Sequence, residues 1–190
     1  MRTKLTTLLL MLFCVVLAMP ASPINNGKEE TLSALAQLPV AGTTMNVRIY
    51  LKSYSTPQEA QQLHSVLMDG GPSALLKTLK KMKPIGRIER EGTVSFYDFK
   101  LIISTPTPTG RRIIAVTDRP MGFREEAFDT RSTEYPFGIL QLDLKDDKKG
   151  KEEGEGTLIY AAQIKDLNLN ALNVENFGVD PVKLLGVRQL

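Results

Sequence analysis

From Ile85 to its end the chain is a series of short apolar segments separated by turn-forming residues. Residues 93–104 are apolar on both alternations, whereas residues 140–145 alternate leucine with polar residues. A period of two is typical of strands, and short connections favour antiparallel neighbours. The sequence therefore predicts a mainly antiparallel sheet, either a sandwich or a partly closed barrel of about eight strands.

Two helices are expected within this β-rich chain. Residues 44–52 alternate apolar and polar side chains and predict the first strand. The sequence Thr56-Pro57-Gln58-Glu59 then combines an N-cap, a first-turn proline and a capping-box glutamate, which together indicate the start of a helix. Gly70 and Gly71 are expected to end that helix, and Pro72 to begin another. We therefore predict an α+β fold with a helical hairpin inserted after the first strand.

This order of elements resembles the layout of intracellular lipid-binding proteins of the calycin group. The resemblance is one of element order, with no shared motif. It implies that the two helices cap the mouth of a barrel.

The N-terminus has the pattern of an export signal. Arg2 and Lys4 precede an uncharged apolar run over residues 5–18, and small residues follow. Cleavage is expected after Ala18 or Ala21; a retained anchor is disfavoured because a spanning helix needs about 20 apolar residues. We therefore predict a secreted or periplasmic protein that meets the membrane only through its signal peptide, before cleavage.

Three segments follow from this organisation: a signal peptide over residues 1–21, a flexible tether over residues 22–43, and a single α+β domain over residues 44–190. The tether is expected because its residues are rich in Pro, Asn, Gly and small side chains.

Composition excludes several kinds of chemistry. Cys14 is the only cysteine and lies in the signal peptide, and His64 is the only histidine. The mature chain is thus expected to lack disulfides, metal sites and cofactors. Its acidic and basic residues nearly balance once Arg2 and Lys4 are removed, which argues against nucleic acid as a partner. No catalytic residue is predicted.

The loop after the strand at residues 111–117 is the candidate ligand-binding region. Its arginines and aromatic residues are the candidate contacts: Arg119, Phe123, Arg124, Phe128 and Tyr135. The alternative is that the aromatic residues anchor the loop to the core while the charged ones face water. The same region holds acidic residues that would serve a hydrolase: Glu125, Glu126, Asp129 and Glu134.

A basic patch is predicted at the end of the second helix, formed by Lys77, Lys80 and Lys81. Such a charge run is either a solvated helix face or a site for phosphate or lipid headgroups.

The segments Ile113–Pro120 and Tyr135–Phe137, preceded by Gly70-Gly71-Pro72, are similar to a group of uncharacterised secreted bacterial proteins of unassigned function. The resemblance implies export and a shared fold, and transfers no activity or ligand. We expect a non-catalytic binding domain for an apolar small molecule or lipid. The alternatives are a cell-envelope protein–protein interaction module and, third, a hydrolase that uses the acidic loop residues.

Overall fold

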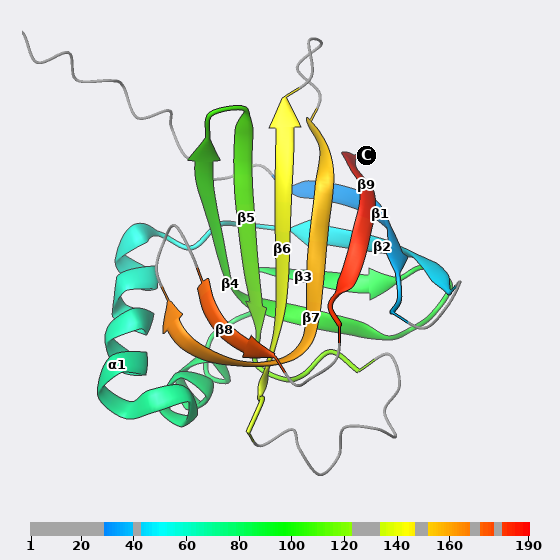
Figure 1. The fold of residues 1–190 in the computed structure, drawn as a ribbon. Coiled ribbons are helices and arrows are strands. Elements are labelled where there is room, and N and C mark those ends of the chain that lie inside the picture. Colours follow the sequence, from blue (N-terminus) through cyan, green and yellow to red (C-terminus); the bar gives the residue numbers. More distant parts are fainter. Residues whose placement is uncertain (1–28, 40–42, 123–133, 147–151, 168–171, 177–179) are drawn as a thin grey trace, which may run out of the picture.

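The computed structural model describes residues 29–39, 43–122, 134–146, 152–167, 172–176 and 180–190. Nine strands and one helix are present in these residues (Figure 1). The strands are β1 (Glu30–Gln37), β2 (Thr44–Leu51), β3 (Gly86–Arg90), β4 (Phe96–Thr107), β5 (Gly110–Thr117), β6 (Phe137–Asp146), β7 (Glu152–Leu167), β8 (Leu172–Asn176) and β9 (Val182–Gln189). The helix is α1 (Pro57–Leu79).

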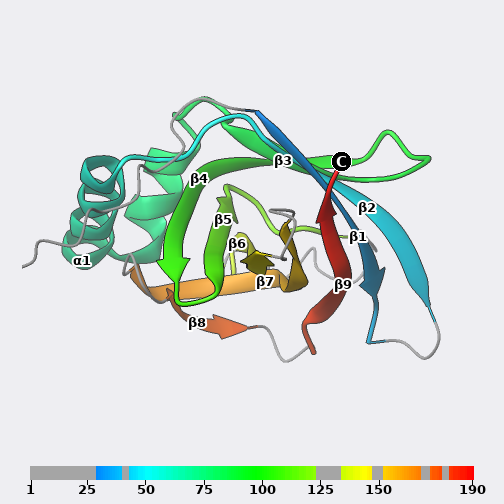
Figure 2. The ribbon, with the colours of Figure 1, turned by 90° about the horizontal axis from the view of Figure 1, so that it is seen from above.

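Eight of the strands close into an antiparallel barrel (Figure 2). The order runs from β6 through β5, β4, β3, β2, β1 and β9 to β7, and β7 pairs with β6 to complete the ring. The short strand β8 lies outside the ring and pairs with the C-terminal half of β7. The predicted antiparallel architecture is confirmed, and closure selects the barrel.

Inward-facing side chains fill the barrel. Along β1, β2 and β6 every second residue belongs to one buried cluster, as the strand period requires. Its largest members are fully buried: Leu32, Ile49, Leu51, Ile88, Phe99, Ile102, Ile113 and Met121. Eight strands enclose a space just wide enough for side chains or one small ligand, and here aliphatic and aromatic groups occupy it.

The helix begins as predicted but is one element. Thr56 is the N-cap and forms a capping box with Glu59. The predicted break is present at Gly71, with φ 70° and ψ −173°, but the segments on either side run as one element, so the helical hairpin is not supported. Gly71 and Pro72 kink the helix.

The helix packs on the outside of the barrel. Leu63, Leu67, Leu75 and Leu79 belong to a second buried cluster, formed with outward-facing residues of β4 to β7 such as Leu101, Ile103, Ile114, Val116 and Ile139. These strands are therefore apolar on both faces, one toward the barrel core and one toward α1. The expected cap over the barrel mouth is wrong for the same reason: the apolar face that α1 covers lies on the wall (Figure 2).

The predicted tether is wrong over residues 30–37, which form β1. This strand pairs with β2 on one side and with β9 on the other. Its inward residues Leu32, Ala34 and Ala36 include two alanines, so its hydrophobic alternation is weak in the sequence. The signal-peptide prediction, at residues 1–21, lies outside the described residues. No helix in the described part of the chain is long and apolar enough to cross a membrane.

The close approach of β6 and β7 generates a prediction about Gly154. A Cβ added there would lie 2.0 Å from the carbonyl oxygen of Asp143, so Gly154→Ala forces apart two strands that close the barrel. We expect it to lower the free energy of unfolding by about 3 kcal/mol, measured by urea denaturation. Gly186→Ala is the matched control, because its Cβ would enter open space and only its φ of +57° is unfavourable. We expect Gly186→Ala to lower the free energy of unfolding by about 1 kcal/mol. Equal losses in the two variants would contradict a steric requirement for glycine at position 154.

Candidate functional site

A network of ionisable side chains lies inside one end of the barrel. Arg111 Nη2 contacts Glu30 Oε2 at 2.5 Å and Glu152 Oε2 at 2.6 Å, and Arg111 Nε donates to Glu152 Oε1 at 2.7 Å. Arg111 Nη1 donates to the Tyr54 hydroxyl at 2.8 Å, and that hydroxyl donates to Glu30 Oε1 at 3.1 Å. We call these four residues the Arg111 network.

The strand period explains why these residues point inward. Ile113 and Ala115 on β5 belong to the barrel core, so Arg111, two residues earlier, faces the same way. Glu30 occupies the corresponding position before Leu32 on β1. In the closed order β1 and β5 lie four strands apart, on opposite walls of the barrel. The side chain of Arg111 therefore reaches across the barrel interior to Glu30 on the opposite wall.

Burial and charge pairing shift the pKa values within the network. Burial alone would lower the pKa of Arg111, but hydrogen bonds to Glu30 and Glu152 outweigh it and raise that pKa. Burial raises the pKa of Tyr54; the Arg111 charge opposes this rise, and the adjacent Glu30 carboxylate adds to it. Arg111 thus stays charged and Tyr54 neutral over the whole physiological range. Because all three guanidinium nitrogens donate to partners, the network closes this end and offers a ligand no free donor nitrogen of Arg111.

The opposite end of the barrel is closed by uncharged groups. Met121 is fully buried and packs on Gly138, where an added Cβ would lie 2.6 Å from Met121 Cγ. The Tyr97 hydroxyl donates to the carbonyl oxygen of Gly122. Thr117 Oγ1 accepts from the Gly138 amide at 2.8 Å. Side chains thus fill this end as well.

One outer wall of the barrel, made by β9, β1 and β2, lies away from α1 (Figure 2). Leu35 and Leu190 are 39% and 65% exposed there, and Leu35 pairs across the sheet with Leu185. With Arg48 and Arg188 they line a hollow of about 430 Å³. We call this surface, defined by Leu35, Leu185, Leu190, Arg48 and Arg188, the open wall.

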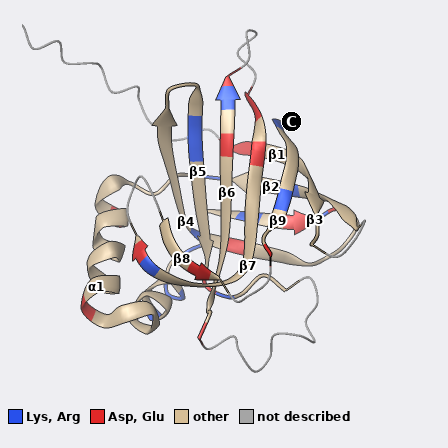
Figure 3. Cartoon of the chain, viewed as in Figure 1, with Lys and Arg blue, Asp and Glu red and all other residues tan. Residues whose placement is uncertain are grey.

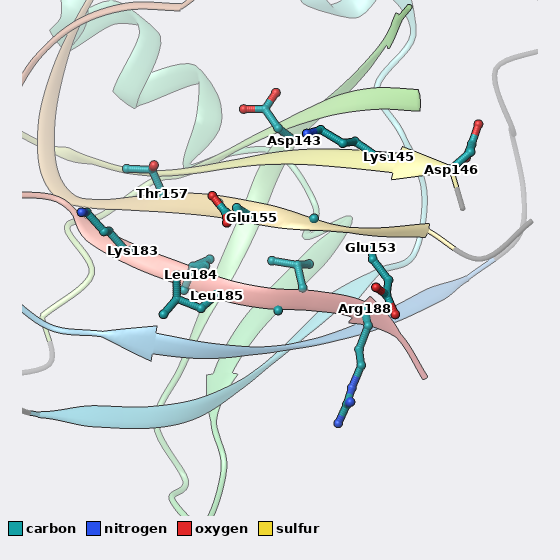
Figure 4. A pocket seen from close by; sticks show the side chains of 14 residues that line it. Asp143, Lys145, Asp146, Glu153, Glu155, Thr157, Lys183, Leu184, Leu185 and Arg188 are labelled. Carbon is teal, nitrogen blue, oxygen red and sulfur yellow. The ribbon is translucent and has the colours of Figure 1, made fainter. Parts of the chain in front are cut away.

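A larger, open hollow of about 940 Å³ adjoins it along β6, β7 and β9 (Figure 4). The two hollows share Leu185, Gly186 and Arg188. Acidic and basic side chains interleave along its walls: Asp143, Lys145, Asp146, Glu153, Glu155, Lys183 and Arg188. Charged residues gather at this end of β5, β6 and β7 (Figure 3). Charges of both signs can match the charge pattern of a partner protein. They do not concentrate one sign of charge as an anion or cation site would.

The predicted loop residues are only partly described. Phe123, Arg124 and Phe128 lie outside the described residues. Arg119 is exposed, and its Nη2 donates to the carbonyl oxygen of Phe96 at 2.8 Å. The Tyr135 hydroxyl donates to Glu175 Oε1 on β8 at 3.1 Å. The structure thus places Arg119 and Tyr135 in separate contacts, and their role in binding stays a prediction.

The remaining candidates are either exposed or outside the described residues. Lys77, Lys80 and Lys81 are exposed around the C-terminal end of α1. His64 Nε2 lies 3.1 Å from Asp166 Oδ1, with both side chains well exposed. Glu125, Glu126 and Asp129 fall outside the described residues. Among the described residues no group of three or more His, Cys, Asp or Glu side chains is arranged to hold a metal ion.

Sequence reasoning missed the Arg111 network and the open wall. One signal for the Arg111 network was available in the sequence. Arg111 is a charged residue in alternation with Ile113 and Ala115, so it occupies an inward position of an apolar strand. Its acidic partners come from β1 and β7, and only the barrel brings these together.

No family model matches the chain, and no curated protein or solved structure matches it significantly. The resemblance to secreted bacterial proteins therefore stays a prediction. The functional argument rests on the geometry of the barrel.

The Arg111 network predicts a strong contrast between two neighbouring arginines. Arg111→Leu would leave the Glu30 carboxylate, whose side chain is 4% exposed, without its cation, and we expect a loss of about 3–5 kcal/mol in unfolding free energy. Arg112→Leu is the matched control, since Arg112 pairs on the outer face with Asp143, at side-chain exposures of 39% and 43%. Its expected cost is below about 1 kcal/mol. Denaturant titration of both variants measures the difference, and similar midpoints would contradict the network's role.

Tyr160 predicts how stability depends on high pH. It packs partly buried against the barrel core, and burial raises the pKa of its hydroxyl to about 12. An unfolded tyrosine ionises near pH 10, so the neutral form stabilises the fold below about pH 10 and that contribution is lost between about pH 10 and 12. Because Tyr160 is partly exposed, we expect its neutral hydroxyl to contribute only about 1 kcal/mol to the free energy of unfolding. Unfolding free energies of wild type and Tyr160→Phe across this window test it, and parallel curves would exclude it.

Proposed function

We propose that this chain is an exported, non-catalytic interaction domain that binds a protein partner of the cell envelope through the open wall. The observation that carries the proposal is the filled barrel interior, from the Arg111 network at one end to Met121 at the other. Closed ends and a packed interior favour recognition on the outside. This ranks the interaction module above the apolar-ligand domain that the sequence first favoured.

The open wall has the properties of a protein-binding surface. Leu35 and Leu185 form an apolar pair across β1 and β9. Arg48 and Arg188 both pair with Ser33, so they lie between this apolar pair and Leu190, whose amide donates to Thr31. Arg48 is held at 2.6 Å by Glu91, so part of its ordering entropy is already lost before a partner arrives. Arginine beside exposed apolar side chains is typical of the residues that dominate binding energy in interfaces.

The alternative function, uptake of an apolar ligand into the barrel, is tested directly. The mature protein is extracted with organic solvent for mass spectrometry and titrated with a fluorescent fatty acid. Because interior side chains occupy the space, we expect no co-purified lipid and no saturable fluorescence change. Stoichiometric lipid in the extract, or saturable binding that Ala36→Trp abolishes, would favour the ligand-binding domain instead.

The open wall predicts which substitutions abolish partner binding. Leu35→Asp and Leu190→Asp each replace an exposed leucine of the open wall with a charged residue, and we expect each to weaken binding by at least about tenfold because apolar burial is lost. Tagged mature protein is incubated with envelope extract, and the partner that wild type retains is identified and quantified. Met68→Asp on α1, 62% exposed, is the control and should retain that partner. Equal retention by all variants would reject the open wall.

A further inference from the structure

The turn between β3 and β4 carries an exposed apolar tip. Val94 is 95% exposed and Phe96 is 43% exposed, although both are large hydrophobic residues. The turn projects beyond the barrel wall, on the side away from α1 (Figure 2). Neither of the two hollows described above includes Val94 or Phe96. This tip is therefore a protruding apolar feature rather than a groove.

Two arginines are held in place around the tip. The guanidinium carbon of Arg87 lies 4.8 Å from the ring centroid of Tyr50 and 5.7 Å from that of Phe96. Arg119 lies 5.0 Å from the ring centroid of Tyr97 and donates to the carbonyl oxygen of Phe96 at 2.8 Å. Stacking on aromatic rings limits the rotamers of both arginines, so less entropy is lost when an anion is bound.

Basic and acidic side chains lie together around the tip. Glu89 accepts from the Tyr50 hydroxyl at 2.7 Å and lies 3.4 Å from Arg87 Nη2, and Glu91 is paired with Arg48 at 2.6 Å. Arg90 and Arg119 are exposed, and neither has an acidic partner among the described residues. Glu89 and Glu91 are thus already engaged, while Arg90 and Arg119 remain available for an external anion.

We infer that the β3–β4 turn docks on an anionic phospholipid surface. Val94 and Phe96 enter the boundary between headgroups and acyl chains, while Arg90 and Arg119 lie at the level of the lipid phosphates. An apolar tip bordered by cations suits a fluid anionic surface, which needs no matching pocket. This goes beyond the proposed protein-binding function, and beyond membrane contact through the N-terminal signal alone. Two apolar side chains give weak, reversible binding.

The test uses the mature chain and vesicles of phosphatidylcholine with or without phosphatidylglycerol. We expect co-sedimentation with the phosphatidylglycerol vesicles, lost at high salt because screening weakens surface electrostatics. Val94→Asp should lower the partition coefficient at least about tenfold, and Arg90→Gln about fivefold. Both sites are exposed, so circular dichroism and the unfolding midpoint should match wild type.

Matched controls lie on the α1 side of the molecule. Met68→Asp makes the same kind of change on α1, and Lys81→Gln removes a cation from the predicted basic patch; both should bind vesicles like wild type. Three results would overturn the inference: no difference between the two vesicle types, full binding by Val94→Asp, or loss of binding in Lys81→Gln alone. If wild type fails to sediment with vesicles and Val94→Asp instead loses a protein partner, the tip is a protein contact. Open-wall variants such as Leu35→Asp should keep vesicle binding, which separates this result from the proposed function.

Discussion

The pairing of β7 with both β6 and β9 determines the architecture of this protein. Without it, eight strands would form an open sheet with two exposed edges; with it, each of these strands gains two hydrogen-bonded neighbours. Closure requires close approach, and Gly154 on β7 provides it by presenting no side chain to Asp143. Because the ring closes, the inward residues of strands far apart in sequence become one core.

Closure also explains the buried charges at one end of the barrel. An arginine inside an apolar core is unfavourable unless carboxylates pair with it and its donors are satisfied. Glu30 and Glu152 supply both, from two strands that neither neighbour β5 nor each other. Removing one member leaves a buried charge uncompensated, so the network discriminates against arrangements in which β1 or β7 is displaced.

Because side chains fill the barrel interior, the two proposed binding surfaces lie on the outside of the barrel. α1 covers the outer side of β4 to β7, whereas the open wall and the β3–β4 turn lie on other parts of the surface (Figures 1 and 2). The open wall offers exposed leucines beside two arginines, which suit the proposed protein partner, and the turn offers a protruding tip with cations that suits the proposed anionic bilayer. Taken together, the two proposals would have the domain hold a protein partner near a membrane.

Local patterns were sufficient for the antiparallel strands, the capped start of α1 at Thr56, and the break at Gly71, because alternation, capping and positive φ depend on near neighbours. Three features depended on contacts between distant residues: the strand β1, whose alanines give only a weak hydrophobic alternation, the position of α1 on the wall, and the carboxylates around Arg111. From the sequence, Ala34 and Ala36 were assigned to a flexible tether. Their strand becomes evident only from its pairing with β2 on one side and β9 on the other. Alternation shows that a strand has two apolar faces, but what each face packs against is decided only when the sheet closes.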